Sequence, residues 1–162
     1  MNPIKQNWYD LPVTMIAEWF GVGRIAPSGT MGTIAAMPVL WGVVFFLGTE
    51  ALYLFTVVIA VVGLLSIFLY QRKRQSHDAK EIVIDEVAGM SVTLCFLPHD
   101  WVSLVIGFVL FRLFDITKPY PINLIDARMN SYWGVMFDDL LAGVYAGLFG
   151  LGILAWLDAG PM

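Results

Sequence analysis

The sequence predicts an all-α membrane protein, a polytopic helical bundle of about three to five spans joined by short loops. Hydrophobic residues make up 59% of the 162 residues and charged residues only 14%, whereas soluble chains are about 45–50% apolar and about 25% charged. The mean hydropathy is +0.75. Long uncharged runs are the second observation, and the third is that Lys and Arg gather in alternate connections between these runs.

Three runs are long enough to cross a bilayer, because a hydrocarbon core about 30 Å thick needs about 20 apolar residues in a helix. They are residues 25–49, with the helix expected to begin near Gly32, and residues 51–71 and 140–157. Two shorter runs, 87–99 and 101–111, either extend into full spans through charged residues or form a buried hairpin. The predicted spans are therefore 32–48, 51–71, 87–98, 101–115 and 140–157.

The whole chain, residues 1–162, is predicted to form one domain, because it contains no linker or low-complexity segment. The segment near residues 13–22 contains Glu18 and is expected to form an amphipathic or packed helix. A single cysteine, Cys95, excludes an intrachain disulfide. The net charge of −4 and the lack of a basic stripe argue against a nucleic-acid partner. The sequence identifies no protein partner.

The distribution of basic residues predicts an orientation. With five crossings and the N-terminus inside, all nine Lys and Arg residues fall on one side of the membrane. The opposite connections carry only Glu50, Asp100 and Asp158, together with His99. Basic residues in short loops favour the cytoplasm, so the first side is predicted to be cytoplasmic. A three-span arrangement with a buried hairpin at 87–111 keeps the same side.

Ten of the thirteen acidic residues also fall on this side, and five of them lie at the predicted helix ends. Asp85 and Glu86 precede the run that begins at residue 87, and Asp138 and Asp139 precede the last span. Helix capping could explain Asp138, Asp139 and Asp85, because first-turn acids suit the helix dipole. Asp115 is different, since it lies near a C-terminal end where a carboxylate is disfavoured. Ionisable groups at membrane depth are costly, so the set indicates a functional site.

Two basic residues accompany the acids in "FRLFDITKPYPI" (111–122). Arg112 and Asp115 are three residues apart and share a helix face, as would Asp115 and Lys118 if the helix reached that far before the prolines. A surface salt bridge is the simpler interpretation. Beside several carboxylates, however, such a pair suits a phosphate ester held next to Mg²⁺. Arg112 is expected to orient Asp115 and bind phosphate, and Lys118 to bind phosphate alone.

The segment "APSGTMGT" (26–33) precedes the first long apolar helix. Gly29 and Gly32 allow the backbone to approach a ligand closely, and Thr30 and Thr33 add hydroxyl groups. The N–H groups at the start of the helix could bind an anion. Ordinary helix capping would use the same residue types.

Four ordered blocks together resemble the phosphatidylglycerophosphatase A family of bacterial membrane lipid phosphatases, over residues of about 20 to 150. They are "GTMGTIAAMP" (29–38), "IVIDEVAGM" (82–90), "FRLFDITKPYPI" (111–122) and "DDLLAGVYAG" (138–147). The resemblance implies Mg²⁺-dependent hydrolysis of phosphatidylglycerophosphate to phosphatidylglycerol and inorganic phosphate, during phospholipid synthesis. It also implies a multi-pass protein of the bacterial cytoplasmic (inner) membrane, with the active site at the cytoplasmic helix ends.

The resemblance carries over to particular residues. The acids expected to be catalytic and to ligate the metal are Asp85, Glu86, Asp115, Asp138 and Asp139, with Asp78 a looser match. The residues expected to bind the substrate phosphate are Gly29, Thr30, Gly32, Thr33, Arg112 and Lys118. Ser28 departs from the family, where proline often precedes the Gly-Thr pair. The residues leave open whether water attacks phosphorus directly or an aspartate forms a phosphoenzyme, how many metal ions bind, and which acid is the base.

Two proteins of other classes would fit parts of this pattern. A small ion-conducting or transport protein could carry carboxylates at one membrane face, but an ion path would place acids along mid-membrane positions. A structural subunit could carry charges that only mark helix ends. The motifs of CDP-alcohol phosphotransferases and of phosphatidate-type phosphatases are absent from the sequence.

Overall fold

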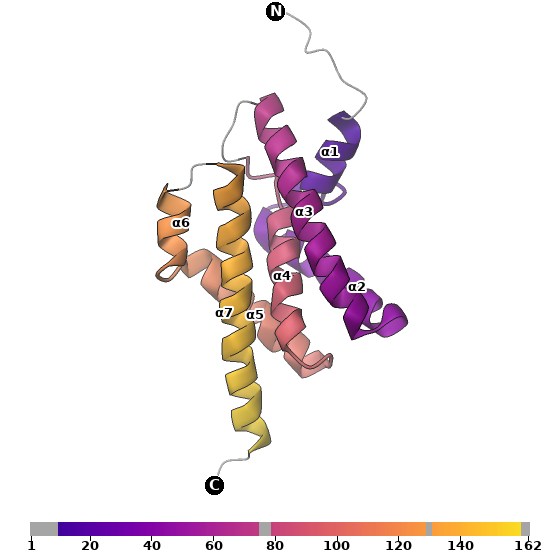
Figure 1. Ribbon diagram of the computed structural model, residues 1–162, viewed down its shortest axis with the longest axis vertical. Helices are drawn as coiled ribbons and strands as arrows, with labels where there is room; N and C mark the ends of the chain where they lie inside the picture. The colour runs from indigo at the N-terminus through magenta and orange to yellow at the C-terminus, as the bar shows by residue number, and fades with distance from the viewer. Residues whose placement is uncertain (1–9, 75–78, 129–130, 160–162) are drawn as a thin grey trace, which may run out of the picture.

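The computed structural model describes residues 10–74, 79–128 and 131–159, and every regular element within them is a helix. The prediction of an all-α bundle is confirmed, and α3, α4 and α7 run alongside one another (Figure 1). The elements are α1 (Asp10–Ala17), η1 (Val22–Arg24, a 3₁₀ turn), α2 (Ser28–Leu47), α3 (Thr49–Arg74), α4 (Ile84–Phe96), α5 (Trp101–Thr117), α6 (Ile122–Arg128) and α7 (Tyr132–Asp158).

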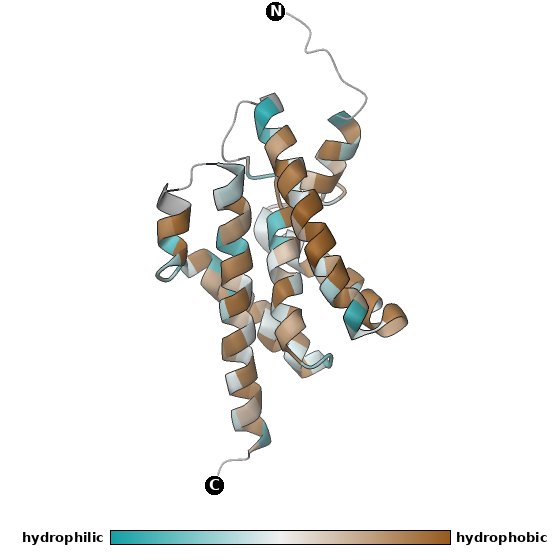
Figure 2. Cartoon of the chain, in the orientation of Figure 1, coloured by the Kyte–Doolittle hydropathy of each residue, from teal (hydrophilic) through white to brown (hydrophobic). Residues whose placement is uncertain are grey.

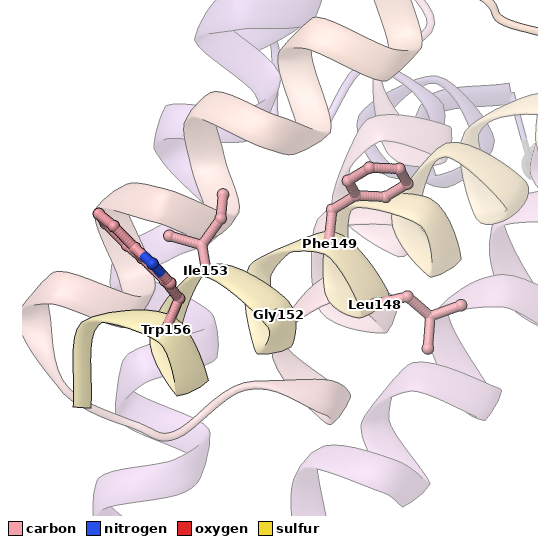
Figure 3. A pocket seen from close by; sticks show the side chains of 5 residues that line it. All are labelled: Leu148, Phe149, Gly152, Ile153 and Trp156. Carbon is pink, nitrogen blue, oxygen red and sulfur yellow. The ribbon is translucent and has the colours of Figure 1, made fainter. Parts of the chain in front are cut away.

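Three of these helices are long and apolar enough to cross a membrane: Ser28–Leu47, Thr49–Arg72 and Tyr132–Asp158. Only 22–28% of their most apolar windows is buried within the protein. Hydrophobic residues predominate along these helices (Figure 2), and many of the large ones are exposed. On the far half of α7, for example, Leu148, Phe149, Ile153 and Trp156 surround a hollow of about 430 Å³ (Figure 3). Such surfaces suit contact with lipid chains.

Two helices begin earlier than the sequence predicted. α2 begins at Ser28 and not near Gly32, so the Gly-Thr segment forms its first two turns. α7 begins at Tyr132 and not at residue 140, so Asp138 and Asp139 are its seventh and eighth residues. Charged residues do not end a helix when neighbouring helices bury them, and both acids are buried. First-turn capping therefore does not explain Asp138 and Asp139.

α4 and α5 are consecutive helices that pack against each other as a helical hairpin. With 13 and 17 residues, they are about 20 and 26 Å long, shorter than the hydrocarbon core. Asp100 caps α5, because its carboxylate accepts hydrogen bonds from the Ser103 amide at 2.9 Å and the Ser103 hydroxyl at 2.8 Å. These two bonds lower the pKa of Asp100. Stacking of Trp101 on Trp41, with ring centroids 5.0 Å apart, joins the hairpin to α2.

Glycines allow the backbones of α4 and α7 to touch. A Cβ atom added at Gly89 would lie 2.6 Å from the carbonyl oxygen of Asp139, and one added at Gly143 would collide with the carbonyl oxygen of Gly89. The Thr93 hydroxyl donates to both glycine carbonyls, at 3.1 and 3.3 Å. Farther along α7, Gly147 and Gly150 receive Phe96 and Leu97. Small residues at such interfaces are how membrane helices approach closely.

Gly143→Ala should therefore destabilise the protein by about 1–3 kcal/mol, because the methyl group has no space against the α4 backbone. Gly152→Ala is the matched control on the same helix. Outside its own helical turn, no heavy atom lies within 4 Å of the place that the new methyl group would take, and alanine is the better helix former by about 1 kcal/mol. Denaturant unfolding of the detergent-solubilised protein measures both. Equal stability of the two variants would contradict the proposed tight contact.

Candidate metal centre and active site

Three carboxylates from two helices converge beside this glycine contact. Asp85 and Glu86 lie in the first turn of α4, and Asp139 lies opposite them on α7. One oxygen from each lies within 4.8 Å of the other two. Asp85 stands four residues before Gly89, and Asp139 stands four residues before Gly143. Since four residues are about one helical turn, the glycine contact holds the acids against each other.

The three carboxylates fit a divalent cation. Asp85 and Asp139 are buried, and Glu86 Oε2 is a buried oxygen without a hydrogen-bond partner among the described residues. Buried carboxylates this close repel one another unless a cation or protons compensate. Oxygen ligands of Mg²⁺ lie at most about 4.2 Å apart across the ion, so the cluster would need to contract only slightly to hold it. These residues offer the carboxylate oxygens that Mg²⁺ prefers, and a small contraction would give the spacing that the ion requires.

Arg112 and Asp115 of α5 border the three carboxylates. Arg112 Nη1 donates to Asp115 Oδ2, and each side chain is 14% exposed, which confirms that they share a helix face. Arg112 Nε is buried and has no hydrogen-bond partner within the described part of the chain. The guanidinium therefore retains one N–H donor that no described residue accepts.

The first turn of α2 reaches the same place. A Cβ added at Gly29 would collide with Glu86 Oε1 and lie 3.0 Å from both terminal nitrogens of Arg112. Only glycine permits this approach. The amides of Ser28, Gly29 and Thr30 lie in the first helical turn and have no acceptor within the helix. Gly29 therefore brings a helix N-terminus against both an acid and a base.

The other half of the Gly-Thr segment has a different position. Gly32 packs on Val83, whose Cβ would lie 2.7 Å from a methyl group added at this glycine. Thr33 is fully buried, and its hydroxyl donates to the Gly29 carbonyl at 2.8 Å. The structure thus places Gly29, and next to it the half-buried Thr30, at the site. Gly32 and Thr33 instead hold α2 in place.

Lys118 has a partner that the sequence did not predict. α5 ends at Thr117, and Lys118 takes a left-handed conformation with φ 41°. Its ammonium group donates to Asp138 Oδ2 at 2.6 Å, which links it to α7. The expectation that Lys118 binds phosphate alone did not include this partner. The expected i,i+3 spacing with Asp115 required the helix to reach Lys118, but α5 ends one residue earlier.

All five predicted acids are thus brought to one region, three of them in direct proximity. Asp85 also serves partly as a cap, since its Oδ1 accepts from the Glu86 amide at 3.2 Å. Asp78 lies outside the described residues. Sequence reasoning missed the roles of Gly89 and Gly143. A signal was present, because "DEVAG" (85–89) and "DLLAG" (139–143) share the pattern Asp-x-x-Ala-Gly.

Comparisons with known proteins agree with this geometry. A family model described as Phosphatidylglycerophosphatase A matches residues 15–154. A Haemophilus influenzae protein named phosphatidylglycerophosphatase A is 35% identical, covering 96% of this chain and 97% of its own. An Escherichia coli protein of the same name is 39% identical over 82% of this chain and 78% of its own. A Bacteroides thetaiotaomicron protein, named provisionally as a phosphatidylinositol-3-phosphatase, is 35% identical over 84% and 89%. No solved structure matches.

Removal of one carboxylate should weaken divalent-cation binding. We expect Asp139→Asn to raise the dissociation constant for Mn²⁺, a spectroscopic substitute for Mg²⁺, by at least about tenfold, because an anionic oxygen ligand is lost. Glu50→Gln is the control, since Glu50 lies at the start of α3, at the opposite end of the bundle. Mn²⁺ titration followed by electron paramagnetic resonance measures both. Parental affinity in Asp139→Asn would exclude this residue as a ligand.

Proposed function

The chain belongs to the phosphatidylglycerophosphatase A family, and we propose that it hydrolyses phosphatidylglycerophosphate to phosphatidylglycerol and inorganic phosphate with the help of Mg²⁺. One observation carries this proposal. The carboxylates Asp85, Glu86 and Asp139 meet Arg112 and the first turn of α2 at one end of an apolar bundle. A lipid phosphate fixed at headgroup depth by its acyl chains would lie at such a helix end.

In this mechanism Asp85, Glu86 and Asp139 hold the metal. When bound, Mg²⁺ would neutralise charge on the phosphoryl oxygens. Asp115 and Asp138 stand beside these ligands and are each paired with a base. Asp115 fixes the guanidinium of Arg112, whose unused donor is available to a phosphoryl oxygen. Hydrolysis breaks the P–O bond to glycerol and transfers the phosphoryl group to water, so stabilisation of charge on its oxygens is the main requirement.

The substrate class also agrees with the names of the relatives. Phosphatidylglycerophosphate and a 3-phosphorylated phosphatidylinositol are both lipids with a terminal phosphomonoester on a polyol. Two of the three relatives carry the phosphatidylglycerophosphatase name, and these favour phosphatidylglycerophosphate here.

We place the protein in the bacterial cytoplasmic membrane with the site on the cytoplasmic side. Arg24, Lys80 and Lys118 lie in the connections next to the site, and Glu50, Asp100 and Asp158 lie at the opposite helix ends. This asymmetry follows the positive-inside rule.

An impermeant thiol reagent tests this orientation. In a Cys95→Ser background, Lys80→Cys should be protected in intact cells and label after permeabilisation, whereas Asp158→Cys should label in intact cells. The reverse pattern would invert the proposed topology.

The ion-conducting alternative is not favoured. The described acids lie at the two ends of the bundle and not along its middle. The larger group is at the end that holds the site, where Arg112 and Lys118 pair with Asp115 and Asp138. A conducting path would need polar groups through the bilayer, but the middle of α4 and α7 is closed by glycine contacts.

The purified protein should release phosphate from phosphatidylglycerophosphate only when Mg²⁺ is present. Asp85→Asn should lower kcat by at least about a hundredfold, because it removes an anionic ligand while keeping side-chain size. Glu50→Gln and Asp158→Asn should stay within about twofold of the parent, because both acids lie at the far end. Full activity in chelator would reject the metal, and equal losses in all three variants would indicate general instability.

Arg112 and Lys118 should respond differently to an exchange of base. Arg112→Lys should lose at least about a hundredfold in kcat/KM, because a point charge cannot replace a planar fork that serves both Asp115 and phosphate. Lys118→Arg should retain measurable activity, since the longer side chain can still pair with Asp138. Phosphate release at matched protein levels measures both. An active Arg112→Lys with an inactive Lys118→Arg would reverse the assigned roles.

A further inference from the structure

A cavity with two basic residues in its lining opens next to the carboxylate cluster. Its volume is about 480 Å³, and it lies between residues 23–29, before and at the start of α2, and the loop before α4. Arg24, Ser28 and Gly29 line one side, and Lys80 and Glu81 line the other. Gly29 also abuts Glu86 and Arg112. The cavity and the proposed active site therefore share this glycine.

A buried network holds Arg24 at the edge of the cavity. Arg24 Nε donates to Glu18 Oε2 at 2.6 Å, and Tyr70 of α3 donates to Glu18 Oε1 at 2.8 Å. Glu18 is only 1% exposed, whereas 63% of the Arg24 side chain is exposed. The bond to Glu18 uses one of five N–H donors of the guanidinium. Glu18 therefore fixes the orientation of Arg24, and the other N–H donors of the guanidinium can bind an anion in the cavity.

The chain that leads into the cavity exposes apolar side chains. Ile25, which follows Arg24, is 51% exposed, and Phe20 on the preceding turn is 68% exposed. Apolar side chains beside bases suit the boundary between lipid headgroups and acyl chains. There the bases can contact the headgroups while the apolar side chains contact the acyl chains. The occupant that fits both features is a phosphate ester attached to a lipid.

We propose that this cavity binds the phosphodiester of the lipid substrate while the terminal phosphomonoester lies at Arg112 and the carboxylates. This inference rests on the proposed function, because phosphatidylglycerophosphate carries both phosphates, joined by glycerol. The glycerol would span the position of Gly29, which lines the cavity and also abuts Glu86 and Arg112. Arg24 and Lys80 bind the singly charged diester, and the first-turn amides of α2 lie between the two phosphates. The cavity selects lipids with two phosphates over lipids that carry only a monoester.

Steady-state kinetics on two lipids test this selectivity. Phosphatidylglycerophosphate has both phosphates, and phosphatidic acid has only the monoester. Lys80→Gln and the double variant Arg24→Gln/Lys80→Gln should raise KM for phosphatidylglycerophosphate by about tenfold, with a much smaller change in kcat. Their loss on phosphatidic acid should be clearly smaller, so the preference for the two-phosphate lipid falls. Arg72→Gln, an exposed base outside the cavity, is the control and should keep the parental preference.

Product inhibition supplies a second measurement. Phosphatidylglycerol keeps the diester and lacks the monoester, so its inhibition constant should rise in Lys80→Gln, a substitution of an exposed side chain that should not disturb folding. Equal losses on both lipids, or an unchanged inhibition constant, would overturn the cavity assignment while the parent still hydrolyses phosphatidylglycerophosphate. A parent that does not hydrolyse this lipid would overturn the proposed function, and the cavity assignment with it.

Discussion

The backbone contact between α4 and α7 at Gly89 and Gly143 is the constraint on which the rest of the structure depends. One turn before each glycine stands a carboxylate, so close packing of the helices also forces Asp85 and Asp139 together. In a membrane, where apolar burial gives little preference for one helix partner over another, small residues decide which helices meet. The contact that stabilises the bundle therefore also builds the charged site.

This arrangement has an electrostatic cost. Two carboxylates about 5 Å apart repel by roughly 3 kcal/mol at an effective dielectric constant of 20, and three such pairs lie in the cluster. Arg112 and Lys118 compensate Asp115 and Asp138 directly, which leaves Asp85, Glu86 and Asp139 for the proposed cation. Because Gly29 has no side chain, the first turn of α2 can lie directly against Glu86 and Arg112. The site therefore favours binding of a cation together with a phosphate group that contacts this cation.

Much of this was predictable from the sequence. Long uncharged runs gave the helices, and the i,i+3 spacing gave the Arg112–Asp115 pair, because both depend on local periodicity. The helix start at Tyr132 was not predictable, since charged residues mark a boundary only when water, and not another helix, surrounds them. The start at Ser28 was not predictable because Ser, Gly and Thr are also typical of the segment that caps a helix. The Lys118–Asp138 pair depends on a left-handed turn and a distant helix. The repeated Asp-x-x-Ala-Gly pattern marks the contact between α4 and α7. Its role could not be recognised from the sequence, because it depends on the two helices touching.

The most direct test of the account joins the glycine contact to the metal. Gly143 carries no ligand, yet Gly143→Ala should weaken Mn²⁺ binding by about tenfold or more, because separation of α4 from α7 moves Asp139 away from Asp85 and Glu86. Gly152→Ala, where the added methyl group would meet open space, should bind Mn²⁺ as the parent does. Isothermal titration of the folded variants gives both affinities. Parental Mn²⁺ affinity in a folded Gly143→Ala protein would contradict the claim that this contact assembles the site.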